Sequence, residues 1–281
     1  MSAFSPETVG RQARLELVFK RQESRTVLER AHVESPLKVT RPYWPDESGQ
    51  AHLILMSPAP GIFGGDEWDL QVSAKSGASV HITPQGALRV HPDVQAQTAR
   101  QRVHLRVESG GTLFWEMEPV IPFRGSSLQQ TIHLELQDGA RLFFWDGFCA
   151  GRVQSGERWE FARLEQDLRL ERDGKLLLLD RFLLEPQSRE VPLHDMNECF
   201  TALLHPASSL SQLDPEGLSP RLQSAASRWG LDEPAPGLFL LRGLVQEGVT
   251  RRRDQAQWRE FLIDQWANPL STPTASGASQ N

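Results

Sequence analysis

Alternation of apolar and polar residues with a period of two dominates residues 14–184 and constrains the fold more than any other feature. The alternation is plain in LELVF (residues 15–19), DLQVS (69–73), RVHLRVE (102–108), TIHLEL (131–136) and DLRLE (167–171). Because successive side chains of a β-strand point to opposite faces, each segment predicts a strand with one face inward and one toward water. The pair Asp173-Gly174 between two such segments predicts a hairpin turn.

A weak internal repeat accompanies these strands. The segments SGASVHI, SGGTLFW and QDGARLFF each place a turn glycine before an apolar strand, at Gly77, Gly111 and Gly139. Recurrence of this kind is typical of stacked β-units, so the pattern leaves open a helically wound, β-helix-like sheet and an ordinary sandwich. In either case the fold class is mainly β, with a smaller α-helical portion toward the C-terminus.

The period changes after Pro192. LHDMNECFTALL (193–204) predicts a helix, and so does SPRLQSAASRWG (219–230), with Pro220 at its first position and Gly230 at its end. LFLLRGLV (238–245) predicts a strand, and residues 251–266 predict an amphipathic helix that packs on its own sheet. The apolar stripe of that last helix consists of Trp258, Phe261, Leu262, Gln265 and Trp266.

These patterns divide the chain into three parts. Residues 1–192 are predicted to form a β-rich domain, and residues 193–266 a mixed helical portion packed on it. Residues 267–281 have few apolar side chains and are predicted to be a disordered tail.

Composition and charge exclude several classes of protein. With 30 basic and 36 acidic residues, the net charge of −6 argues against a general nucleic-acid binder. The first twenty residues lack the apolar core of a signal peptide, and no stretch approaches the ~18 apolar residues of a membrane span. We therefore expect a cytoplasmic protein. Cys149 and Cys199 form no CxxC motif and are predicted to be small buried hydrophobic residues.

The glycine-rich segment PGIFGGD (60–66) follows a predicted strand and resembles a phosphate-binding loop only superficially. A loop of that kind needs a lysine and a hydroxyl residue after its last glycine, whereas Asp66 stands where the lysine would be. By elimination, Gly61, Gly64 and Gly65 are predicted to provide positive φ or a close approach of two backbones.

Three aspartates stand at the ends of apolar strands and are the candidate functional residues. Asp66 follows GIFGG, Asp146 lies in RLFFWDGF, and Asp180 ends KLLLLD. A carboxylate in apolar surroundings is costly unless it is paired or bound to a cation, so each needs a partner. Arg152 and Arg181 are the candidate partners nearby in sequence, and buried ion pairs or capped turns are the structural alternative to a functional role.

Three long segments together resemble one protein family. They are SPLKVTRPYWPDESGQAHLILMSPAPGIFGGDEWDLQV (35–72), GASVHITPQGALRVH (77–91) and LFFWDGFCAGRVQSGERWEFARLEQDLRLERDGKLLLLDRFLL (142–184). Their order and spacing resemble the urease accessory protein UreD, called UreH in some bacteria. The chain departs from the family pattern at Leu88-Arg89, where the family has a hydroxyl residue and lysine, and at His91-Pro92, where it has tyrosine and arginine.

The resemblance implies a mostly β, helically wound fold with a smaller helical part, and a non-catalytic role in inserting nickel into urease. Members of the family act as scaffolds that bind the urease apoprotein and recruit UreF and the GTPase UreG, and we expect two copies of such a complex to associate. The family is also thought to pass nickel through an interior passage, and the acids implied by the resemblance are Asp66, Asp146 and Asp180. No tightly bound cofactor and no tight metal site are expected, since nickel in transit must be released.

Two other function classes remain open from the residues themselves. The chain could be an enzyme with an unrecognised acid–base pair among these aspartates, acting on a polar small molecule. It could also be a β-solenoid structural module that needs neither metal nor urease.

Overall fold

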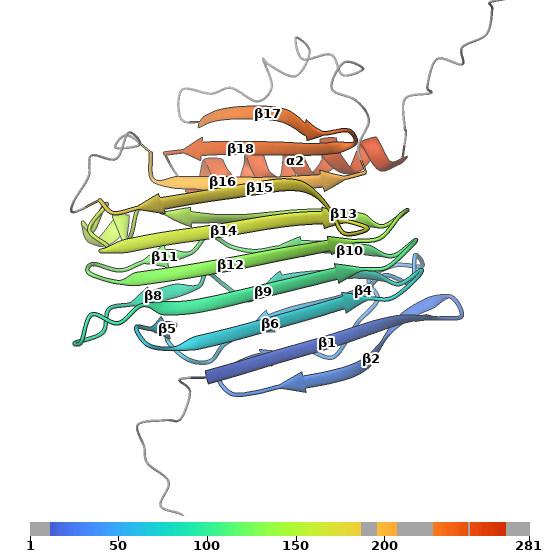
Figure 1. Ribbon diagram of the computed structural model, residues 1–281, viewed down its shortest axis with the longest axis horizontal. Helices are drawn as coiled ribbons and strands as arrows, with labels where there is room; N and C mark the ends of the chain where they lie inside the picture. The colour runs from blue at the N-terminus through green and yellow to red at the C-terminus, as the bar shows by residue number, and fades with distance from the viewer. Residues whose placement is uncertain (1–11, 187–195, 207–226, 247, 268–281) are drawn as a thin grey trace, which may run out of the picture.

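Two large β-sheets face each other across the core and continue from one end of the molecule to the other (Figure 1). The computed structural model describes residues 12–186, 196–206, 227–246 and 248–267. In chain order the strands are β1 (Gln12–Gln22), β2 (Arg25–Val33), β3 (Lys38–Val39), β4 (Ala51–Met56), β5 (Ile62–Phe63), β6 (Glu67–Ala74), β7 (Ser79–Pro84), β8 (Arg89–His91), β9 (Ala99–Val107), β10 (Thr112–Glu116), β11 (Ile121–Pro122), β12 (Ser127–Leu136), β13 (Arg141–Cys149), β14 (Arg163–Arg172), β15 (Lys175–Leu184), β16 (Glu198–His205), β17 (Ser227–Ala235) and β18 (Leu238–Val245). Besides these strands, the described residues include a short 3₁₀ turn, η1 (Val153–Ser155), and the helix α2 (Gly248–Ala267), which follows β18.

The strands form three sheets with distinct orders. Sheet A has the order β15-β14-β12-β9-β6-β1-β2, sheet B the order β17-β18-β16-β13-β10-β7-β4-β3, and the small sheet C the order β11-β8-β5. Successive coils run from sheet B through sheet C to sheet A, as in β4-β5-β6, β7-β8-β9 and β10-β11-β12. Neighbouring coils pair in parallel, as β6 does with β9 and β7 with β10. This confirms the helically wound, mainly β fold and excludes the ordinary sandwich.

The weak sequence repeat corresponds to stacked turns between sheets A and B. Gly77, Gly110 and Gly139 have φ values of 69°, 68° and 71°, and they follow β6, β9 and β12 respectively. Glycine adopts this left-handed conformation without a steric penalty. The repeat is therefore confirmed, with one change: the matching glycine of the middle unit is Gly110 and not Gly111.

The alternating segments form one-sided strands, as predicted. In β6 the buried positions Trp68, Leu70 and Val72 alternate with partly exposed ones, and the buried side chains enter the core between sheets A and B. The hairpin between β14 and β15 turns at Asp173-Gly174, where both residues have positive φ. The turn prediction is thus confirmed.

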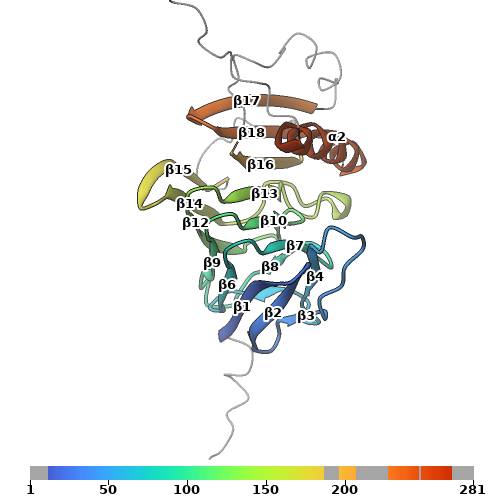
Figure 2. The same cartoon turned by 90° about the vertical axis from the view of Figure 1, so that its right-hand side faces the viewer.

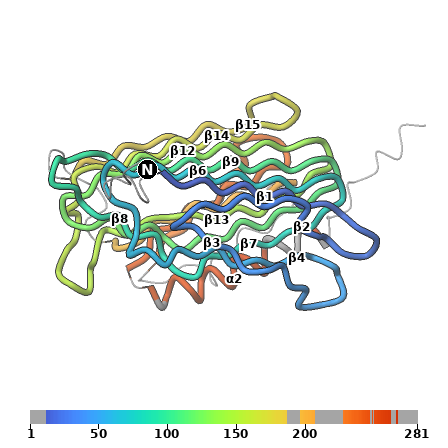
Figure 3. The backbone as a smooth tube through the Cα atoms, turned by 90° about the horizontal axis from the view of Figure 1, so that it is seen from below, coloured from blue at the N-terminus to red at the C-terminus, as the bar shows by residue number. Residues whose placement is uncertain are grey.

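Strand β13 is buried on both faces, which explains its continuous apolar run. Phe144 belongs to the core between the two sheets, while Phe143 and Trp145 belong to a second core on the other side of sheet B. Helix α2 covers that second core on the side of sheet B away from sheet A (Figures 2 and 3). From α2, Trp258 is 3% exposed there, and Phe261 and Trp266 pack against the cluster.

The helix near the C-terminus and the strand before it are therefore confirmed. Leu262 and Gln265 belong to the same predicted stripe, but their side chains lie outside the described part of the chain. In the described ranges, no helix combines the length and apolar character required to cross a bilayer.

The two helices predicted after residue 192 were wrong where the structure describes them. Glu198–His205 is strand β16, which pairs with β13 and β18. Its Phe200, Ala202 and Leu204 face the second core and Leu203 faces the first, so two-sided burial removes the alternation that marks a strand. Ser227–Ala235 is strand β17, so Gly230 ends no helix. Residues 187–195, 207–226 and the tail 268–281 lie outside the described ranges.

Candidate functional site

Asp146 lies on β13 among apolar side chains and is the most deeply buried of the three candidate acids. It shares the inward face of the strand with Leu142 and Phe144 and is 4% exposed. The carboxylate accepts hydrogen bonds from the backbone N–H of Gly147 at 2.8 Å and from Gln166 Nε2 at 3.2 Å. Burial nevertheless dominates and raises the pKa of Asp146 from its ordinary value of 3.8 to about 6.

A row of three glutamines crosses sheet A opposite Asp146. Gln101 on β9, Gln130 on β12 and Gln166 on β14 are in register and point inward. Gln166 Nε2 donates to Gln130 Oε1 and Gln130 Nε2 donates to Gln101 Oε1, each at 2.9 Å. The row thus forms a polar line through a core that is otherwise apolar.

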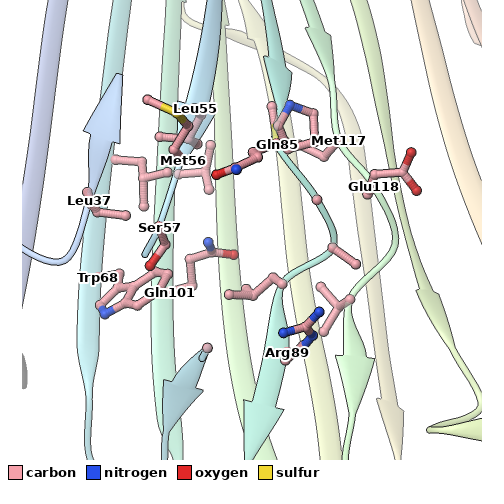
Figure 4. Close-up of a pocket in the computed structure, with 18 of the residues that line it drawn as sticks. Leu37, Leu55, Met56, Ser57, Trp68, Gln85, Arg89, Gln101, Met117 and Glu118 are labelled. Atoms are coloured by element: carbon pink, nitrogen blue, oxygen red, sulfur yellow. The ribbon is translucent and has the colours of Figure 1, made fainter. Parts of the chain in front are cut away.

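Asp146 lines two separate cavities. The first, of about 450 Å³, lies between the sheets beside the loops that connect sheet B to sheet C (Figure 4). Gln101, Gln130 and Asp146 form part of its polar lining, and Gly61 of the glycine loop also borders it. The second, of about 460 Å³, lies where the edge strand β15 faces β17 and β18, and it is lined by Gln166 and again by Asp146. The buried carboxylate is therefore the group shared by both spaces.

Asp180 lines the second cavity together with Asp146. Its Oδ1 lies 2.7 Å from Arg242 Nη2 of β18, and this ion pair links sheet A to sheet B at the rim of the cavity. The structure therefore brings two of the three candidate acids to one space.

Asp66 occupies a different place, at the turn before β6. Its carboxylate accepts a hydrogen bond from the backbone N–H of Phe63 at 2.9 Å, and its own N–H donates to the Phe63 carbonyl at the same distance. It is not among the residues that line either cavity.

The glycines of the loop behave as predicted from the sequence. A Cβ on Gly61 would lie 2.1 Å from the carbonyl oxygen of Arg89, and one on Gly64 would lie 2.4 Å from that of Gln97. Gly65 has a φ of 87°. Close backbone approach and positive φ are both present, so this interpretation of the loop is confirmed.

The arginines near the candidate acids pair elsewhere. Arg181 Nε lies 2.7 Å from Asp167 Oδ2, and Arg152 Nε donates to Glu157 Oε2 at 2.9 Å. The prediction that Arg152 and Arg181 are partners of the aspartates was therefore wrong. Residue i+1 on a strand faces away from residue i, so Arg181 and Asp180 point to opposite faces.

The glutamine row was missed at the sequence level, although a signal for it exists. Each of the three strands places one glutamine at a position where its alternation calls for an inward apolar residue. A single such exception is unremarkable in one strand. Its recurrence in consecutive coils is the signal that marks a polar line in the core.

Comparison with known proteins identifies related sequences. The sequence profile of the UreD urease accessory protein family matches residues 11–274. A urease accessory protein UreD from Nitrosococcus oceani is 32% identical over 93% of this chain and 88% of its own length. The corresponding figures for the Deinococcus radiodurans protein of that name are 30%, 91% and 92%. One from Sorangium cellulosum is 36% identical over 63% of this chain, and that match spans only 55% of the relative's length.

Proposed function

Because this chain belongs to the UreD family of urease accessory proteins, we propose that it acts in the maturation of urease as a non-catalytic scaffold. In this role it binds the urease apoprotein in the cytoplasm and recruits UreF and the GTPase UreG. The absence of a phosphate-binding loop from the sequence supports this division of labour, since nucleotide hydrolysis is then left to a partner.

The interior supplies a route for nickel in transit. Asp146 carries this part of the proposal, because it lines both cavities and is the anionic group that they share. Asp180 continues the acidic lining in the second cavity, and the glutamine row provides amide oxygens beside it. Asp66 contributes indirectly: its carboxylate accepts a hydrogen bond within the glycine turn, and Gly61 of that turn borders the first cavity.

The chemistry of this lining suits passage more than storage. Ni²⁺ binds imidazole and thiolate ligands strongly, whereas oxygen ligands hold it more weakly. No histidine or cysteine lines the first cavity, and Cys199 in the second is kept protonated because burial raises the pKa of its thiol. A route lined by the carboxylates of Asp146 and Asp180 and by the glutamine amides can admit a cation and release it again.

Urease activation in cells tests the scaffold role. A urease operon lacking this chain should give inactive urease, and restoring the chain should return activity and allow UreF, UreG and urease subunits to copurify with it. Full activity without the chain, and no copurification of these partners, would overturn the proposal.

The acids are then tested within the assembled complex. Asp146→Asn and Asp180→Asn should lower urease activation and nickel content while the partners still copurify. Asp138→Asn, on an exposed turn, is the matched control and should have no effect. Unchanged nickel content in the triple variant Asp66→Ala, Asp146→Ala and Asp180→Ala would contradict the interior route and leave the scaffold role standing.

A further inference from the structure

Two histidines and a glutamate gather on the outer face of sheet A, on the side opposite the glutamine row. His104 on β9 is in register with His133 on β12, and their rings stack at a centroid distance of 5.0 Å and an interplanar angle of 8°. Glu135 follows His133 by two residues, so it projects from the same face of β12. Strand register therefore brings together residues that lie 29 positions apart in the sequence.

The donor atoms of these side chains converge on one point. Glu135 Oε1 lies 3.1 Å from His104 Nε2 and 3.5 Å from His133 Nδ1, and one donor atom from each residue lies within 4.8 Å of the others. Ligands of a tetrahedral ion with bonds of about 2.0–2.1 Å are separated by about 3.4 Å. The two distances to the carboxylate oxygen are close to this value, and binding would require the stacked imidazole planes to turn toward each other so that both nitrogens face one ion.

His104 Nε2 lies beside Glu135 without forming a hydrogen bond. The atom is buried and forms no hydrogen bond with any described residue, although it lies at ion-pair distance from Glu135. A buried ring nitrogen without a hydrogen bond is costly, and a bound cation would satisfy it.

The other ring nitrogen of His133 has the surroundings expected of a metal ligand. His133 Nε2 lies 3.5 Å from Glu171 Oε2, and Arg169 Nε donates to the other oxygen of Glu171. A histidine that binds a metal through one nitrogen usually directs the other toward a carboxylate, which fixes the orientation of the ring. Glu171 stands in that position on the neighbouring strand β14.

We propose that His104, His133 and Glu135 form a binding site for a first-row divalent transition-metal ion, with Glu171 orienting His133. Two imidazoles and one carboxylate favour such an ion over Mg²⁺ or Ca²⁺, which prefer oxygen ligands alone. The three side chains are about one-third exposed, so an ion can enter from solvent and water can complete its coordination. Arg106 and Arg169 are the register neighbours of Glu135 and His133.

Titration of the purified, metal-free full chain with Ni²⁺ tests the site. Calorimetry should show one equivalent bound at this site, and His104→Gln, His133→Gln or Glu135→Gln should each weaken it by at least about tenfold, since even loss of a supporting group costs that much. His32→Gln is the matched control, because His32 also lies beside a glutamate on an outer strand of sheet A. Mg²⁺ should produce no comparable heat.

Cu²⁺ provides a direct view of the ligands. Electron paramagnetic resonance should show coupling to two imidazole nitrogens, reduced to one in His104→Gln. Unchanged Ni²⁺ affinity in all three variants would overturn the proposal, and so would a Cu²⁺ spectrum without nitrogen coupling.

The site does not rest on the proposed function, because the isolated chain suffices for both measurements. Asp146→Asn separates it from the interior route: that variant should bind Ni²⁺ on the outer face as the parent does.

Discussion

The buried carboxyl group of Asp146 destabilises the fold at neutral pH, although the proposed nickel route depends on its charge. Because the pKa of Asp146 is about 6 in the folded chain and 3.8 ordinarily, the folded state holds this proton more tightly than the unfolded state. Its contribution to the free energy of unfolding is therefore a penalty that is fully present above pH 6 and vanishes as the pH falls toward 3.8. Each unit by which the pKa is raised costs about 1.4 kcal/mol, so Asp146→Asn should stabilise the fold at pH 7.5 by up to about 3 kcal/mol.

Urea unfolding at pH 7.5 and pH 5 measures this effect. The stability gain of the Asn variant should shrink at the lower pH, while Asp138→Asn on the exposed turn should give the same small effect at both. A gain that does not depend on pH would show that the carboxyl of Asp146 is not the titrating group.

The glycine loop makes a second residue-level prediction. Gly61→Ala places a methyl group 2.1 Å from the carbonyl oxygen of Arg89, and backbone must move to accommodate it. We expect a loss of about 1–3 kcal/mol in the free energy of unfolding, typical of overpacking. Gly86→Ala is the matched control, since a Cβ there meets no atom within 4 Å although Gly86 lines the same cavity. Equal stability of the two variants, measured by urea unfolding, would contradict the steric argument.

At the scale of elements, one arginine attaches α2 to sheet B. Arg251 is 4% exposed; its Nη2 lies 2.7 Å from Glu118 and its Nε 3.0 Å from Glu198 on β16. Arg251→Met keeps the aliphatic part of the side chain but leaves the partly buried Glu198 without this cation. Because breaking a buried ion pair from one side strands the other charge, we expect a loss of about 3 kcal/mol.

Neighbouring Arg252 provides the control for this helix. It is exposed, so Arg252→Met should leave stability within experimental error. Chemical denaturation followed by tryptophan fluorescence suits the comparison, because Trp258 of α2 lies in the second core. If both variants unfold at the same denaturant concentration, the attachment of α2 depends on its apolar face alone.

The elements also show which parts of the fold the sequence can reveal. One-sided strands such as β6 alternate and were predicted, because one face meets the core and the other meets solvent. Strand β16 was mistaken for a helix, because Phe200 and Leu203 enter two different cores and its apolar residues follow one another. Burial on both faces depends on α2 covering sheet B, a tertiary fact that no local pattern carries.

At the scale of the whole molecule, winding of the chain creates the candidate sites. Asp146 stands out in the sequence as an acid within an apolar run, but Gln166 lies 20 residues later on β14, and Gln130, which joins Gln166, comes from the preceding coil. His104 and His133 similarly meet through strand register, so metal-site spacing along the chain could not reveal them. A local motif fixes where a side chain points, whereas the stacking of coils decides what it meets.

The same winding makes the interior route testable by obstruction. Ala87 lines the first cavity, so Ala87→Phe should fill part of it without removing any charge. We expect a several-fold loss of nickel incorporation into urease, with UreF, UreG and urease subunits still copurifying. Val94→Phe, at a fully exposed position in the loop before β9, should leave incorporation unchanged. Nickel content of purified urease measures both, and full incorporation with the first cavity filled would mean that the ion reaches urease by another path.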